Sequence, residues 1–143
     1  MHQGFIIIYC AAILYLAYTD LSTGLIPNRI ILPAIVIAAV ETVIMGTWRS
    51  DITGGALALA LFVLPILIYG HELAGAGDAK LALFLGLWLG YPTVLSAILV
   101  AALAVSLFGF RASLHGGLSR KTTVPMAPFF AFGVLTTMLV FGV

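Results

Sequence analysis

The amino-acid sequence predicts an all-α integral membrane protein, a bundle of about six transmembrane helices, and two observations carry this prediction. Hydrophobic residues make up 63% of the 143 residues and charged residues only 8%, whereas soluble domains contain roughly 25% charged residues. The hydrophobic residues also form continuous runs and do not alternate with polar residues, as they would in the strands of a membrane β-barrel. The length suits one domain over residues 1–143.

Six apolar runs are separated by joints that contain polar residues, glycine or proline. In chain order, we expect helices at about residues 4–19, 29–46, 53–70, 79–90, 92–110 and 125–142. Crossing a hydrocarbon core about 30 Å thick takes about 20 helical residues, with a range near 17–25, and most runs come close. The run 79–90 is short, and Gly86, Gly90 and Pro92 crowd its end, so we expect it to be tilted, kinked or only partly spanning. Five spans is the alternative to six.

The first run, 4–19, is expected to be a retained first span. Met1-His2-Gln3 contains no lysine or arginine, and no cleavage site of the A-x-A type follows the run, so the run does not match a secretory signal. Cys10, the single cysteine, lies inside it. One cysteine excludes an internal disulfide and a CxxC metal site, and we interpret Cys10 as a small packing residue.

The distribution of lysine and arginine over the five joints predicts the orientation in the membrane. The joints lie at about residues 19–29, 47–51, 71–80, 90–92 and 111–124. The odd joints hold Arg29, Lys80, Arg111, Arg120 and Lys121, whereas the second holds Arg49 and the fourth holds neither residue type. Cytoplasmic loops carry an excess of lysine and arginine. We therefore expect a multi-pass protein of the inner (plasma) membrane, with its odd joints in the cytoplasm and, given six spans, both termini outside.

Two aspartates are the candidate catalytic residues. Asp20 ends the first run and Asp78 opens the fourth, so both are expected on the cytoplasmic side. Two close carboxylates cannot both ionise cheaply, and one tends to keep a proton. The ionised member can then take a proton from water while the protonated member polarises a carbonyl. The alternative is that each aspartate is an interfacial cap, with Asp78 capping a helix that starts at Ala79.

The residues around Asp78 favour a functional site. Gly75 and Gly77 precede it, and glycine allows close backbone approach and unusual dihedral angles. Lys80 follows, and it either counters a carboxylate or extends its ammonium group to the interface. Glu41 and Asp51 lie near the opposite membrane face, so they are excluded from the site.

Three motifs carry a resemblance to a known family. Gly75-Ala76-Gly77-Asp78-Ala79-Lys80 resembles the GxGD signature of membrane aspartic peptidases. Asp20 followed by Ile26-Pro27-Asn28 resembles the first aspartate motif of type IV prepilin peptidases, and Val124-Pro125-Met126-Ala127-Pro128 is similar to the proline-bearing start of their last span. In this order the motifs span nearly the whole chain. The sequence resembles the short prepilin peptidases, including those of tight-adherence pilus systems and archaeal preflagellin peptidases.

The resemblance implies a membrane aspartic endopeptidase whose catalytic residues are Asp20 and Asp78, facing the cytoplasm. It implies substrate-binding or loop-shaping roles for Gly75, Gly77, Lys80, Pro27 and Asn28. The implied substrate is a pilin-like precursor, cleaved after a short basic leader that precedes its apolar N-terminal helix, without a metal or organic cofactor. Longer family members also methylate the new N-terminus and carry an insert with paired CxxC motifs. This sequence has no such motif, so the resemblance supports the peptidase step and assigns no residues to methylation.

Other interpretations have weaker support in the sequence. His71-Glu72 begins like the HExxH zinc motif, but position 75 is glycine, so the second histidine is missing. A net charge of +1 without a basic patch gives no sign of nucleic-acid binding. The main rival is a small proton- or ion-coupled transporter that uses the two aspartates, and a third possibility is a non-catalytic scaffold. Transporters commonly contain internal repeats and ionisable groups near mid-membrane, and neither is visible here. Lipid surrounds the protein in every case, and the sequence does not indicate its oligomeric state.

Overall fold

The structure, a computed structural model, describes residues 5–70, 75–114 and 124–142, and these form six α-helices. In chain order they are α1 (Ile6–Thr23), α2 (Asn28–Met45), α3 (Trp48–Tyr69), α4 (Ala76–Leu89), α5 (Thr93–Leu114) and α6 (Ala127–Phe141). Four of them, α1, α2, α3 and α5, are long and apolar enough to cross a membrane. The predicted all-α membrane bundle is therefore confirmed. The 14 residues of α4 span about 21 Å at 1.5 Å per residue, less than the hydrocarbon core.

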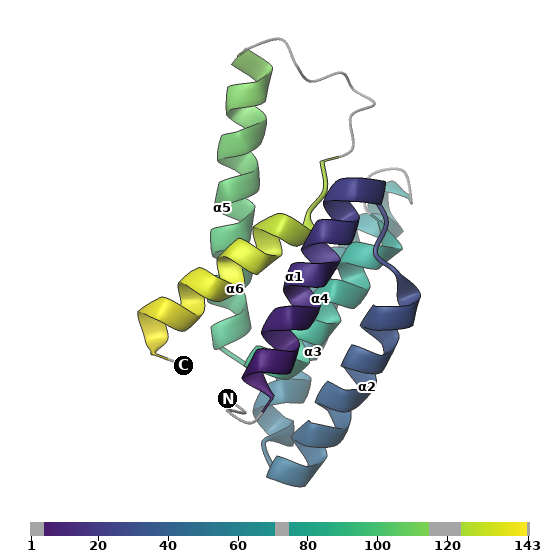
Figure 1. Cartoon of the computed structure of the whole chain (residues 1–143), viewed down its shortest axis with the longest axis vertical. Helices are drawn as coiled ribbons and strands as arrows, with labels where there is room; N and C mark the ends of the chain where they lie inside the picture. Colours follow the sequence, from purple (N-terminus) through teal and green to yellow (C-terminus); the bar gives the residue numbers. More distant parts are fainter. Residues whose placement is uncertain (1–4, 71–74, 115–123, 143) are drawn as a thin grey trace.

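Successive helices run in opposite directions, so alternate helix ends lie together. Figure 1 shows α1, α3 and α5 ending toward the same end of the molecule, where α2 and α4 begin. The described helix ends that flank the odd joints therefore lie at one end, as expected. At this end the last turns of α5 extend beyond the other helices (Figure 1).

Helix α1 is longer than its apolar run predicted, because its polar residues bond within the helix. The hydroxyls of Thr19, Ser22 and Thr23 each donate to a main-chain carbonyl three or four residues earlier, at 2.7 to 3.0 Å. This back-bonding satisfies side chains that otherwise favour a turn. The helix ends at Gly24, whose φ of 66° is the left-handed conformation that glycine tolerates best. Helix α3 likewise begins at Trp48, before the predicted start at residue 53.

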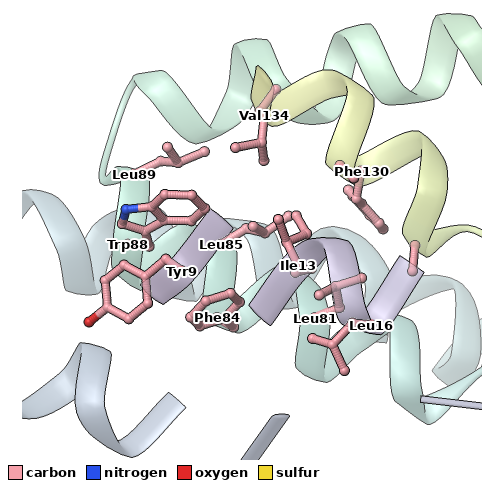
Figure 2. Packing of buried hydrophobic residues seen from close by; sticks show 14 of the residues in the cluster. Tyr9, Ile13, Leu16, Leu81, Phe84, Leu85, Trp88, Leu89, Phe130 and Val134 are labelled. Atoms are coloured by element: carbon pink, nitrogen blue, oxygen red, sulfur yellow. The ribbon is translucent and has the colours of Figure 1, made fainter. Parts of the chain in front are cut away.

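Helix α4 is the centre of the bundle. Nine of its 14 residues are buried, and it packs against α2, α3 and α5. A helix that is hydrophobic all round is one that is buried all round, which explains why the run 79–90 shows no polar face. Its Leu81, Phe84, Leu85 and Trp88 meet Tyr9 and Ile13 of α1 in the main hydrophobic cluster (Figure 2).

Glycines allow two pairs of helices to approach closely. Gly86 of α4 lies so near Gly54 and Gly55 of α3 that a Cβ atom at position 86 would be 2.5 Å from Gly54 O. A Cβ atom at Gly133 of α6 would be 2.3 Å from the carbonyl oxygen of Ala97 on α5. Small residues at helix interfaces are typical of membrane bundles, in which van der Waals packing drives helix association.

Candidate active site

Asp20 lies in the last turns of α1 and is held by a second helix. Its side chain is 5% exposed, and its Oδ2 accepts a hydrogen bond of 2.9 Å from the main-chain N–H of Ala127. Ala127 is the first residue of α6, whose own N-cap residue Met126 makes no side-chain capping bond. A side-chain oxygen that accepts a hydrogen bond from the free N–H groups of the first helical turn caps that helix. Asp20 therefore caps α6, a helix that begins more than 100 residues later in the chain.

Asp78 lies in the first turn of α4 and is not its cap. The helix begins at Ala76, its N-cap is Gly75, and no side-chain capping bond is made. The alternative in which Asp78 caps a helix starting at Ala79 is therefore wrong. The physical reason is that the Asp78 N–H bonds the carbonyl of Gly75 at 3.1 Å, so the helical turn already includes Ala76 and Gly77.

The two aspartates are close enough to interact electrostatically. Asp78 precedes the apolar part of α4 and lies outside the four candidate spans. Burial, and after it the negative charge of Asp20, raises the pKa of Asp78 from 3.8 to about 6. Like charges in a partly buried site disfavour double ionisation. The structure thus brings together the two aspartates that the sequence singled out, while their catalytic role stays a prediction.

The two glycines before Asp78 have ordinary backbone conformations. Gly75 has φ −76° and ψ 137°, and neither glycine is among the residues with positive φ. The expectation of unusual dihedral angles is therefore wrong for this loop. Gly77 instead provides space, since a Cβ atom there would be 3.2 Å from the Cβ of Ile26. Close approach, the other expected use of glycine, is what the structure shows at Gly77.

Pro27, Asn28 and Lys80 lie where the start of α2 meets α4. Pro27 is the N-cap residue of α2, and its carbonyl accepts hydrogen bonds from the main-chain N–H groups of Ile30 and Ile31 at 3.1 and 3.2 Å. The Nζ of Lys80 donates to Oδ1 of Asn28, the first residue of α2, at 2.9 Å. The sequence predicted that Lys80 either counters a carboxylate or extends to the membrane interface. The structure shows that its ammonium group links α4 to α2.

A second group of polar side chains is buried at the other end of the bundle. The sequence predicted that Glu41 and Asp51 lie near the opposite membrane face, but it did not predict their burial or their hydrogen bonds. Glu41 of α2 and Asp51 of α3 are each 4% exposed. Tyr9 donates its hydroxyl proton to Glu41, and Thr42 donates to Asp51 at 3.1 Å. Tyr9 precedes Asp20 by eleven residues, about 16 Å along a helix. This separation agrees with the exclusion of Glu41 and Asp51 from the candidate active site.

The other candidate ligands do not form a cluster. Within residues 5–70, 75–114 and 124–142, no group of three or more histidine, cysteine or acidic side chains is arranged to hold a metal ion. His71 and Glu72 lie outside the described residues. Cys10 is half-buried in α1 and packs against the core, in agreement with its interpretation as a packing residue.

Comparison with known proteins gives consistent matches along the chain. Residues 7–110 match the model of the type IV leader peptidase family. The chain is 35% identical over 136 residues to a prepilin leader peptidase/N-methyltransferase of Burkholderia pseudomallei (strain 1026b), covering 90% of this chain and 44% of that protein. It is 30% identical over 135 residues to the protein of that name from Bacillus subtilis (strain 168), covering 93% and 54%. The chain thus spans about half the length of these relatives. No solved structure matches it.

Proposed function

Because this chain belongs to the type IV leader peptidase family, we propose that it is a membrane aspartic endopeptidase that removes the leader of type IV pilin-like precursors. The observation that carries the proposal is the pair formed by Asp20 and Asp78 at one end of the bundle, in which burial and then the negative charge of Asp20 raise the pKa of Asp78. The names of the relatives, prepilin leader peptidase/N-methyltransferase, support the substrate class.

The two environments divide the acid and base roles between the carboxylates. We assign the base role to Asp20, which accepts a hydrogen bond from the first N–H of α6. We assign the acid role to Asp78, because burial and the negative charge of Asp20 raise its pKa. Asp20 would take a proton from water as the water oxygen attacks the scissile carbonyl carbon, and Asp78 would donate its proton to the carbonyl oxygen. Collapse of the tetrahedral intermediate breaks the C–N bond. The leaving amine receives the proton that Asp20 took, and one hydroxyl of the intermediate returns its proton to Asp78 as the new carboxyl group forms.

The site lies where a precursor with a charged leader and an apolar helix can present its cleavage point. Asp20 and Asp78 lie near the ends of apolar helices, at the level where a membrane-embedded substrate helix would leave the hydrocarbon. The lysine and arginine bias of the odd joints supports a cytoplasmic orientation in the inner membrane. In this orientation the leader would remain in the cytoplasm while the apolar helix stays in the lipid.

Coexpression with a leader-bearing pilin-like precursor tests the proposal. Wild-type protein should convert the precursor to the shorter form on a gel, whereas Asp20→Asn and Asp78→Asn should leave it intact at equal abundance in the membrane. Asp51→Asn is the matched control, because Asp51 is buried and hydrogen-bonded but lies at the other end of the bundle. Full processing by either Asp20→Asn or Asp78→Asn would rule out the pair as the catalytic site.

A further inference from the structure

Residues 24–28, which comprise the joint between α1 and α2 and the first residue of α2, contact the start of α4 on both sides of Asp78. On one side, Ile26 lies against Gly77, where an added Cβ atom would be 3.2, 3.4 and 3.5 Å from the Cβ, Cδ1 and Cγ1 atoms of Ile26. On the other side, Lys80 Nζ donates to Asn28 Oδ1 at 2.9 Å. These contacts join the segment that follows Asp20 to the segment that contains Asp78.

We propose that Ile26 is a positioning residue, whose side chain, seated on Gly77, sets the distance between the carboxylates of Asp20 and Asp78. The Asn28–Lys80 hydrogen bond holds the same two segments together at a second point. This inference rests on the proposed peptidase function, since it assigns a role within that active site.

Other contacts fix Asp20 and the rest of α4, so the contact between Ile26 and Gly77 is the one that can change the spacing of the two carboxylates. Asp20 is held from the other side by the Ala127 N–H of α6, and α4 beyond its first turn is packed among three helices. Carbon atoms in contact are ordinarily about 3.5–4.0 Å apart. The shortest distance from an added Cβ atom at Gly77 to Ile26, 3.2 Å, is a few tenths of an ångström shorter, so a methyl group at position 77 would require a shift of Ile26 or of the first turn of α4.

A small change in this contact is expected to affect the chemistry. Displacing a catalytic group by about 1 Å can lower the rate on the order of 100-fold. Among the described residues, the charged groups that contact or interact with this turn are Asp20 from α1 and Lys80 of α4, and the ammonium group of Lys80 donates to Asn28. Moving Asp78 away from Asp20 weakens the repulsion between them, so the upper apparent pKa of the pair falls.

The test is a double-mutant cycle on the purified full chain with a leader-bearing pilin-like precursor as substrate. Gly77→Ala is expected to lower kcat about tenfold with KM unchanged, and to move the alkaline limb of the pH–rate profile to lower pH. Ile26→Ala should also lower kcat, because the carboxylates lose their fixed spacing. In the double variant the methyl group at position 77 occupies space vacated by Ile26. The fold-decrease in kcat of the double variant should therefore be smaller than the product of the fold-decreases of the two single variants.

Two matched controls separate positioning from general effects. Gly109→Ala adds a methyl group to a helix where nothing lies within 4 Å, and Leu25→Ala removes a neighbouring side chain that is 72% exposed. Both should keep the wild-type rate and pH profile. Independent losses in the double variant, or a Gly77→Ala profile that superimposes on the wild-type profile, would overturn the inference.

Ile26→Ala decides the matter if Gly77→Ala does not fold, because it adds no atoms that could clash. A normal kcat with an unchanged pH profile for folded Ile26→Ala would overturn the role of Ile26. The proposed function fails separately, if the wild-type chain leaves the precursor intact.

Discussion

Gly86 of α4 lies against the backbone of α3, and Gly86→Ala is expected to lower the thermal stability of the folded chain. An added Cβ atom would be 2.5 Å from both Gly54 O and Gly55 Cα, about 1 Å inside ordinary contact. These are backbone atoms, so the two helices must separate. Overpacking costs roughly 1–3 kcal/mol, and this contact belongs at the upper end. The better helix propensity of alanine offsets about 1 kcal/mol, so the net loss is about 2 kcal/mol.

The matched control is Gly109→Ala on α5, where nothing lies within 4 Å of the added methyl group. There the propensity gain of up to about 1 kcal/mol stands alone, so the two variants should move Tm in opposite directions. The assay is thermal unfolding in detergent, followed by tryptophan fluorescence, to which Trp88, buried two residues from Gly86, contributes together with the exposed Trp48. Equal or higher Tm for Gly86→Ala than for Gly109→Ala would refute the reasoning from close helix approach.

Three further predictions concern the polar groups. Because burial and the charge of Asp20 raise the pKa of Asp78 from 3.8 to about 6, the folded state binds its proton more tightly than the unfolded chain, and this stability is lost as pH rises through 6. The Tm of Asp78→Asn should therefore be higher than the wild-type Tm at pH 8 and close to it at pH 4. An equal Tm difference at both pH values would show that the protonation of Asp78 is not coupled to folding. Tyr9→Phe removes the hydroxyl donor to buried Glu41, so it should cost about 1–3 kcal/mol of stability in a melting experiment while the folded enzyme keeps its cleavage rate; unchanged Tm would show that this bond contributes nothing. With Cys10 replaced, a cysteine at exposed Ser50 should react with a membrane-impermeant maleimide added outside intact cells, and one at exposed Ser22 should not; the reverse pattern would invert the orientation.

Most of the fold could be predicted from apolar runs, because lipid demands a continuous stretch of hydrophobic residues for each span. The errors lie at the helix ends. Asp20 was expected to end the first helix, yet α1 continues to Thr23 because hydroxyl side chains bond back to carbonyls. Composition cannot show this, since the same residues are equally typical of turns.

The candidate site was predictable in its residues and unpredictable in its contacts. Asp20 and Asp78 stood out because two acids at the ends of apolar runs were expected on the same side of the membrane, one of them behind Gly75 and Gly77. The bond from Ala127 to Asp20 joins positions far apart in the chain, and no local pattern encodes it. The contact between Ile26 and Gly77 could not be predicted for the same reason, because it also joins distant positions. In addition, nothing distinguishes one isoleucine from the others in an apolar sequence. The burial of Glu41 could have been predicted, because Glu41 is an acid inside a continuous apolar run. A buried carboxyl group needs a hydrogen-bond partner, and Tyr9 is that partner.

The most direct test of the central claim is cleavage of a precursor by the purified chain in detergent, with a chelator present and no energy source, followed by mass spectrometry of the new N-terminus. We expect one cut between the leader and the apolar helix, made by wild type and Asp51→Asn and by neither Asp20→Asn nor Asp78→Asn. Intact precursors, together with ion or proton flux through sealed vesicles that depends on Asp20 and Asp78, would contradict it.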